Sequence, residues 1–253
     1  MSTLQIISIG SSSAGNSTLI FNDTAAILLD SGVPVKQVIE KTGRKKFTAL
    51  LISHEHSDHI KTAGALARKT KTPLYVSKLA VQKWSIKHPK DFDDCTLHDI
   101  TDTSVLQFGN ITVKGFSTKH DAAHALGFVF QEPGTKFCYL TDTGSISKTM
   151  YGNIKDCDSY FIECDYDDDM IKEYEGYGQD LKDRITSNFG HLSTQQALDL
   201  VQSLDVARPR KFIIGHLSQR TNSVEKIREH IKTRFPAHTD KFIVAPFDGV
   251  VDL

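Results

Sequence analysis

Cysteine is scarce in this chain of 253 residues, which has four, and no two of them are spaced as Cys-x-x-Cys. The sequence therefore contains no local zinc knuckle, and unpatterned thiols predict reduced cysteines and a cytoplasmic protein. Long apolar runs are also missing, as is a basic segment followed by an apolar one near the N-terminus. We therefore expect neither a membrane span nor a signal peptide.

An excess of charge of one sign is lacking too, because 30 basic and 31 acidic residues leave a net charge of −1. No global field therefore draws the protein to nucleic acid or to a membrane. Short basic runs at residues 44–46 and 208–211 leave room for a local patch, although such runs are usually solvated surface. The chain also lacks internal repeats and low-complexity linkers, and its length suits one domain over residues 1–253.

Short apolar runs bounded by turn residues predict strands, and amphipathic runs predict helices. The predicted strands are 4–9, 17–21, 26–29, 49–53, 105–108, 111–116, 127–131, 137–140, 212–214 and 242–244. The predicted helices are 35–41, 61–70, 80–87, 197–204 and 227–233. The last two follow capping-box patterns, Ser193 with Gln196 and Asn222 with Glu225. Strands in two groups, each followed by helices, predict an α/β fold of two packed sheets with helices outside, a four-layer αββα sandwich.

Four of the predicted strands end on a side chain that can bind a metal ion. These side chains are Asp30, His54, Asp142 and His216. Sites in α/β proteins form at strand ends, where a rigid sheet meets exposed loops. Four such ends beside a dense histidine cluster therefore indicate one shared site.

The histidine cluster is the run His-Glu-His-Ser-Asp-His at residues 54–59. Imidazole and carboxylate groups are ligands of zinc, iron and manganese. Side chains alternate along an extended turn, so His54 and His56 can point the same way. Asp58 and His59 begin the following helix and can face a second ion. A polar loop that is merely rich in histidine is the alternative, and the density of ligands favours the metal site.

Six residues cannot complete two coordination spheres, so the remaining ligands must come from later in the chain. His120 follows the strand 111–116, and His124 is its competitor. Asp142 can bridge two ions because a carboxylate has two oxygens, and His216 can complete the second sphere. Each of these is a weak candidate alone, and the cluster at 54–59 creates the need for them.

The order of these motifs resembles the metallo-β-lactamase superfamily over nearly the whole chain. The resemblance implies an αββα sandwich that holds two divalent metal ions (zinc, manganese or iron) bridged by Asp142. One ion would be held by His54, His56 and His120, and the other by Asp58, His59 and His216. Asp30 would orient the histidine loop from behind the ligands.

Two neighbouring metal ions clamp the attacking and leaving oxygens of a displacement. A water or hydroxide that bridges them has its pKa lowered to about 7 and becomes the nucleophile. This chemistry suits phosphodiesters, thioesters, lactams and lactones, so the ligand set alone does not select the substrate.

His191 bears on that choice, because it lies just before a capped helix whose N-terminus favours an anion. It can bind a phosphate oxygen or protonate the leaving alkoxide, and from the residues alone a purely structural role is equally good. The candidate catalytic residues are therefore Asp58 and His191.

A His-Ser segment between the bridging Asp and the last His is similar to phosphodiesterase members such as ribonuclease Z and the cyclic phosphodiesterase of phosphonate breakdown. The chain most resembles the YycJ/WalJ-like group of phosphodiesterases and exonucleases, through residues 10–17, 53–59, 120–122, 142–144, 190–193 and 216–218. The resemblance implies a phosphodiester substrate, which is single-stranded DNA, RNA or a small cyclic or nucleotide diester. At residues 163–167 the chain departs from the group, with Glu-Cys-Asp-Tyr-Asp in place of Glu-x-Asn-His-Asp.

Two alternatives stay open. A glyoxalase II-like thioesterase or lactonase has the same fold, but the short stretch after His216 leaves little room for the helical region that such enzymes add. A non-enzymatic metal-bound module is disfavoured because every expected ligand position is filled.

The segment between Asp142 and His216 is too short for a ribonuclease J-like inserted domain, so the site is expected to be open or covered only by residues 165–184. The acidity of that segment disfavours binding of long nucleic acid, and we interpret it as a solvated helix face.

Overall fold

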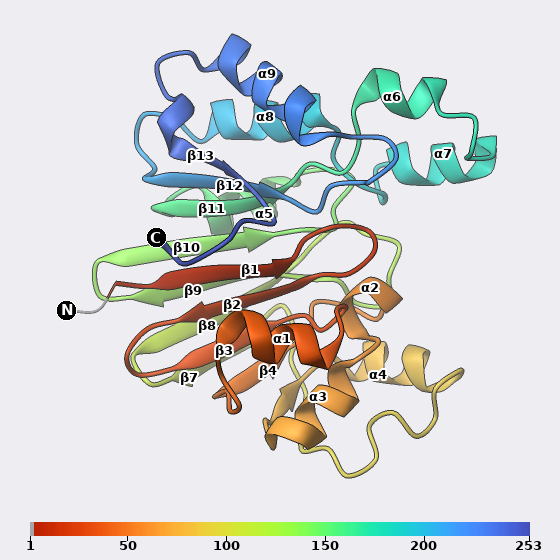
Figure 1. Cartoon of the computed structure of the whole chain (residues 1–253), viewed down its shortest axis with the longest axis vertical. Coiled ribbons are helices and arrows are strands. Elements are labelled where there is room, and N and C mark those ends of the chain that lie inside the picture. Colours follow the sequence, from red (N-terminus) through yellow and green to blue (C-terminus); the bar gives the residue numbers. More distant parts are fainter. Residues whose placement is uncertain (1–2) are drawn as a thin grey trace.

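The structure is a computed structural model that describes residues 3–253, and it contains two seven-stranded sheets (Figure 1). The first sheet has the order β14-β1-β2-β3-β4-β5-β6. Its strands are β1 (Gln5–Gly10), β2 (Ser17–Phe21), β3 (Ala26–Leu29), β4 (Ala49–Leu51), β5 (Leu74–Tyr75), β6 (Leu97–His98) and β14 (Val251–Asp252). The strands from β3 to β6 are parallel to one another.

The second sheet has the order β13-β12-β11-β10-β9-β8-β7. Its strands are β7 (Val105–Phe108), β8 (Ile111–Ser117), β9 (Leu126–Glu132), β10 (Thr135–Leu140), β11 (Ser159–Glu163), β12 (Lys211–Gly215) and β13 (Phe242–Val244). The strands from β10 to β13 are parallel. Because parallel strands end at the same edge, each sheet delivers several strand-end residues to one place.

Helices cover the outer face of each sheet (Figure 1). Beside the first sheet are α1 (Val35–Thr42), α2 (Ser57–Ile60), α3 (Ala63–Thr70) and α4 (Lys78–Ser85). Beside the second are α5 (Lys148–Ile154), α8 (Thr194–Ser203) and α9 (Val224–Arg234), with the 3-10 turn Thr239–Lys241 near the C-terminus. The short helices α6 (Asp168–Glu173) and α7 (Gln179–Thr186) project from one end of the sandwich.

Alternate strand residues enter different cores, which explains why the strands are apolar throughout. In β3, Ile27 and Leu29 pack between the sheets, and Leu28 packs against the helices. In β10, Tyr139 packs between the sheets, and Leu140 packs against the other helix layer. A sheet that is buried on both faces needs such continuous apolar runs. The predicted αββα sandwich is therefore confirmed.

Most predicted elements are present, and one helix start was wrong. The capping box of Ser193 and Gln196 is present at α8. At α9 the cap is Ser223, whose Oγ accepts a hydrogen bond from Lys226 N, and not Asn222. The Asn222 side chain instead donates to Cys164 O at 2.8 Å, because it is buried against that strand end. Among residues 3–253 no helix is long and apolar enough to cross a bilayer, and all four cysteines are free.

Candidate metal centre

The ends of β3 and β4 form one side of the site. Asp30, directly after β3, accepts hydrogen bonds from Ser53 N at 2.8 Å and from His59 Nδ1 at 2.7 Å. Because Nδ1 of His59 is held by this carboxylate, its Nε2 is directed into the site. Histidine ligands of metals are commonly oriented in this way by a carboxylate behind them.

The loop that carries Asp58 is held by close packing against the N-terminal loop. Asn16 Nδ2 donates to Asp58 Oδ2 at 3.0 Å, and Asn16 N donates to Asp58 O at 2.7 Å. Gly32 lies against the same carbonyl, and a Cβ on it would stand 1.5 Å from Asp58 O. Only glycine permits this approach, so Gly32 and Asn16 together fix the position of Asp58.

Four side chains surround one space that has the dimensions of a tetrahedral ion site. His59 Nε2 lies 3.2 Å from Asp58 Oδ2 and 3.3 Å from Asp142 Oδ2. His216 Nε2 lies 3.5 Å from Asp58 Oδ2 and 3.4 Å from Asp142 Oδ1. Ligand atoms at zinc–ligand bond lengths around a tetrahedral ion are about 3.4 Å apart. The donor atoms therefore fit an ion of this size.

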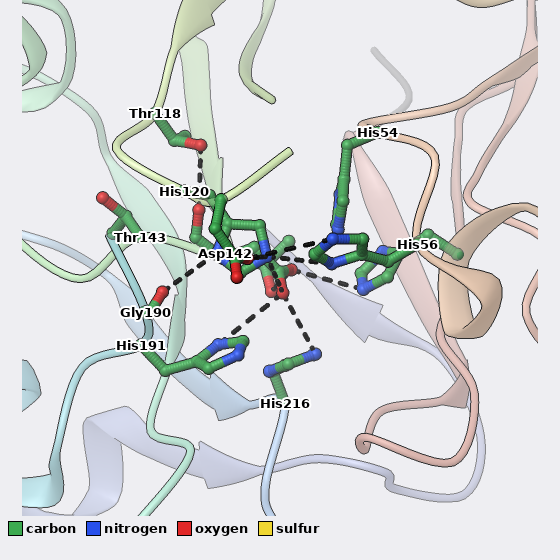
Figure 2. Close-up of polar contacts among 12 residues, drawn as sticks. His54, His56, Thr118, His120, Asp142, Thr143, Gly190, His191 and His216 are labelled. Atoms are coloured by element: carbon green, nitrogen blue, oxygen red, sulfur yellow. Dashed lines mark hydrogen bonds and ion pairs between the residues drawn. The ribbon is translucent and has the colours of Figure 1, made fainter. Parts of the chain in front are cut away.

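Three histidines, His54, His56 and His120, form a second group beside Asp142 (Figure 2). His120 donates from Nδ1 to Gly190 O at 2.9 Å, which directs its Nε2 to a point 3.1 Å from His56 Nδ1 and 3.7 Å from Asp142 Oδ1. His54 Nε2 is buried, and no described residue forms a hydrogen bond with it. Buried ring nitrogens normally have a partner, so His54 has the environment of a metal ligand.

The backbone is strained where three strands deliver their side chains. Asp30, Asp142 and His216 have φ values of 59°, 56° and 53°, in the left-handed region that non-glycine residues seldom adopt. Asp30 directly follows β3, and His216 directly follows β12. Asp142 is separated from the end of β10 by one threonine. Such strain costs about 1 kcal/mol or more per residue and is concentrated at functional sites. The sharp turn redirects each side chain from the sheet into the space between the strand ends.

His191 lies beside Asp142 and is held by a carboxylate that the sequence analysis left without a role. Its Nδ1 donates to Glu163 Oε2 at 3.0 Å and lies 3.7 Å from Asp142 Oδ1. Glu163 is fully buried and also accepts a hydrogen bond from Thr143 N. His191 is not the helix cap, because Ser193 has that role. With Nδ1 held, Nε2 of His191 is the ring nitrogen left for a substrate.

Buried carboxylates dominate the electrostatics of the site. Burial alone would lower the pKa of His191, but the charges of Asp165 and Glu163 raise it to about 10. The pKa of His59 is likewise raised despite burial, chiefly by Asp142. Burial lowers the pKa of His54 well below its usual range, and neutral imidazole is the form that binds metals. The surplus of negative charge is suited to bound cations.

The structure brings together the side chains that the sequence analysis selected. The predicted ligands that converge are His54, His56, Asp58, His59, His120, Asp142 and His216. His124 is outside these groups, and Glu163 and Asp165 join the site. A signal for Glu163 was present, since β11 is an apolar run that ends on a carboxylate, as the other site strands do.

A pocket of about 360 Å³ opens over the site. Its floor includes Asp58, Asp142, His191 and His216, and one wall is formed by α7 and the turn before it. Residues 165–184 therefore cover one side of the site, which agrees with the expected position of this segment.

Comparisons with known proteins place the chain among metal-dependent hydrolases. A family model described as the beta-lactamase superfamily domain matches residues 27–217. The chain is 32% identical over 223 residues to the exodeoxyribonuclease WalJ of Streptococcus pneumoniae, covering 86% of this chain and 82% of that protein. It is 29% identical over 229 residues to the exodeoxyribonuclease YycJ of Bacillus anthracis, covering 87% and 84%. The solved structure of the metallo-beta-lactamase fold protein YhfI from Bacillus subtilis matches with a TM-score of 0.77 at 17% identity, covering 99% of this chain and 100% of that chain.

Proposed function

The chain belongs to the metallo-β-lactamase superfamily, in the group that holds WalJ and YycJ, and from this premise we propose that it hydrolyses phosphodiester bonds in single-stranded DNA. It is a metal-dependent hydrolase of the nuclease and phosphodiesterase class. The substrate proposal is supported by the names of the two relatives, both exodeoxyribonucleases. In the molecule itself, the observation that carries it is the pair of His191 and Glu163 at the edge of the ligand groups.

The ligand groups would accommodate two divalent ions, with Asp142 between the groups. We propose that His54, His56 and His120 hold one of them, and that Asp58, His59 and His216 hold the other. Zinc, manganese and iron all accept such imidazole and carboxylate ligands. When bound, the ions supply a nucleophile at neutral pH and neutralise charge on the reacting phosphate.

Asp58 and His191 are placed to orient the attacking water and to protonate the leaving oxygen. Asp58 has one carboxylate oxygen in the ligand group and a side chain that is 20% exposed at the pocket floor. It is placed to accept a hydrogen bond from the attacking water and so to orient it. His191 Nε2 faces the pocket, where it donates a proton to the leaving oxygen as the phosphorus–oxygen bond breaks.

Glu163 keeps His191 protonated and oriented for that transfer. Its carboxylate holds Nδ1–H of His191, which fixes the ring orientation and stabilises the charged imidazolium before the transfer. After the transfer, His191 keeps the proton on Nδ1, which stays hydrogen-bonded to Glu163. Its Nε2 then takes up a new proton from solvent. The buried position of Glu163 excludes water from this contact, so the orientation is maintained through the cycle.

Hydrolysis assays on the metal-loaded protein test the proposal. Single-stranded DNA and bis-p-nitrophenyl phosphate are expected to be cleaved, and a thioester and a lactone serve as comparison substrates for the alternative. Hydrolysis of the thioester or the lactone, with neither phosphodiester cleaved by protein of verified metal content, would reject the proposed function.

A further inference from the structure

The wall of the metal pocket that α7 forms is chemically unlike its floor. The floor consists of charged ligands, whereas the wall presents the side chains of Tyr177, Leu181, Arg184 and Ile185. No residue of α7 is buried, and Leu181 is 38% exposed. The apolar side of this helix and the aromatic residue before it therefore line the pocket without a protein core to cover them.

Each end of the wall is hydrogen-bonded to a segment that carries a proposed metal ligand. At one end, Arg184 Nε donates to Asp121, the residue after His120. At the other, Arg220 Nη1, from the loop after His216, donates to Tyr174 OH at 2.6 Å. These two hydrogen bonds tie the wall to the segments that carry His120 and His216.

The C-terminal end of α7 packs closely against Gly190 and His191. His191 N donates to Ile185 O at 2.9 Å. A Cβ on Gly190 would stand 2.1 Å from Ile185 O and 2.3 Å from Arg184 O, so this approach requires glycine. The wall and the proposed proton donor are therefore in direct backbone contact.

Tyr177 is the aromatic residue of this wall. Its ring packs edge to face against Tyr174, with 4.7 Å between centroids and 77° between planes. This contact supports the ring while leaving Tyr177 half-buried at the pocket. An aromatic ring that lines the proposed phosphodiester site is suited to stack on a nucleobase.

The charge on the outside of the wall points to a base and not to a phosphate. Exposed carboxylates outnumber basic residues on α6 and α7, at Asp168, Asp169, Glu173, Asp180 and Asp183. They repel backbone phosphates, whose binding needs cations. Arg184 is already engaged with Asp121. What the wall offers inside the pocket is therefore a ring and aliphatic side chains.

We propose that Tyr177 stacks on a nucleobase next to the bond that is cleaved, with Leu181 against the same nucleoside. This inference rests on the proposed function, and it assigns to residues 174–185 the recognition of a base in single-stranded nucleic acid. Stacking is tolerant of sequence, because every base has a π-face. The subsite therefore selects nucleic acid over simple phosphodiesters without selecting a sequence.

The test compares hydrolysis of a single-stranded DNA of about ten nucleotides with hydrolysis of a strand of the same length in which every nucleotide lacks its base. The wild-type protein is expected to have the lower KM for the DNA that carries bases. In Tyr177→Ala this KM rises roughly 5- to 150-fold, the range for loss of one base–aromatic stack, while KM for the abasic strand and the metal content are unchanged. Tyr177→Phe keeps the ring and retains the wild-type preference.

Two controls separate stacking from folding. Tyr151→Ala removes a partly exposed tyrosine on α5, outside the pocket, and should alter neither KM. Tyr177→Leu keeps apolar bulk against Tyr174 without the ring, and should behave as Tyr177→Ala does, which keeps the test decisive where the alanine variant fails to fold.

The inference would be overturned if Tyr177→Ala raised KM equally for both DNA strands. It would also be overturned if this variant left both KM values unchanged. A wild-type protein that cleaves both strands with the same KM would also overturn it while leaving the proposed function intact. A metal-loaded wild-type protein that cleaves neither strand would reject the nuclease function itself.

Discussion

The two sheets contribute to the metal centre in different ways. The first sheet supplies its proposed ligands from one short segment, residues 54–59, with Asp30 behind it. The second supplies one side chain from each of several segments, His120, Asp142 and His216, together with the pair of Glu163 and His191. The first half is local in sequence, whereas the second exists only because parallel strands end side by side.

The difference also extends to the carboxylates that stand behind the histidines. Asp30 holds Nδ1 of His59, whose other nitrogen is in a ligand group. Glu163 holds Nδ1 of His191, whose other nitrogen faces the pocket. The same contact thus orients a proposed metal ligand in one half and a proposed proton donor in the other. Substitutions in the two halves should therefore change different measured quantities.

Asp142 belongs to both halves, so its substitution should have the largest effect. In Asp142→Asn the shared carboxylate is lost, and we expect lower metal content and DNA hydrolysis reduced about a thousandfold or more, since several kcal/mol of charge stabilisation are removed. Metal analysis and initial rates measure both. Asp240→Asn, at an exposed carboxylate near the C-terminus, is the matched control and should match the wild type. Wild-type metal content and rate in Asp142→Asn would show that Asp142 does not link the halves.

His191→Ala tests whether the second half contains a proton donor. We expect turnover to fall by about 10²- to 10⁴-fold, the usual contribution of general acid catalysis, with metal content unchanged. Single-turnover rates and metal analysis on the same sample measure this. Loss of metal instead would make His191 a ligand, as its grouping with Asp142, Glu163 and His216 also permits geometrically.

Asp30→Asn tests the carboxylate of the first half. Loss of the charge that orients His59 should weaken metal binding by about 10- to 100-fold, as is typical for residues behind a metal ligand. Competition with a chelator gives the dissociation constant. At saturating metal the rate should recover substantially, and an unchanged dissociation constant would contradict the role of Asp30.

Glu163→Gln tests the corresponding carboxylate of the second half, and the smallest effect is expected here. The amide preserves shape and can still accept from His191, so we expect turnover to fall by about tenfold, within the lower range of proton-transfer effects. The metal dissociation constant should stay at the wild-type value. A change in metal affinity as large as that of Asp30→Asn would remove the distinction between the two halves.

The same division decides how much the sequence could predict. The ligands in residues 54–59 are recognisable because three histidines and an aspartate fall within one turn. Asp142 and His216 were predicted because each follows an apolar strand. Glu163 follows a strand of the same kind, but β11 was not among the predicted strands, so its carboxylate was left without a role.

Contacts between distant segments were the part that the sequence did not reveal. The wall formed by α7 depends on Arg184 reaching Asp121 and on Gly190 lying against Ile185, and neither pairing follows from local propensity. The helices α6 and α7 are short and have few buried residues, so few apolar positions mark them in the sequence. The extent of the domain, residues 1–253, stays a prediction.

Titration of metal-stripped protein with manganese or zinc, followed by DNA hydrolysis, tests the central claim most directly. If the two halves form one centre around Asp142, the stripped protein has no activity, and full activity requires two bound ions per chain. Full activity with one ion per chain, or hydrolysis by the stripped protein, would contradict the account.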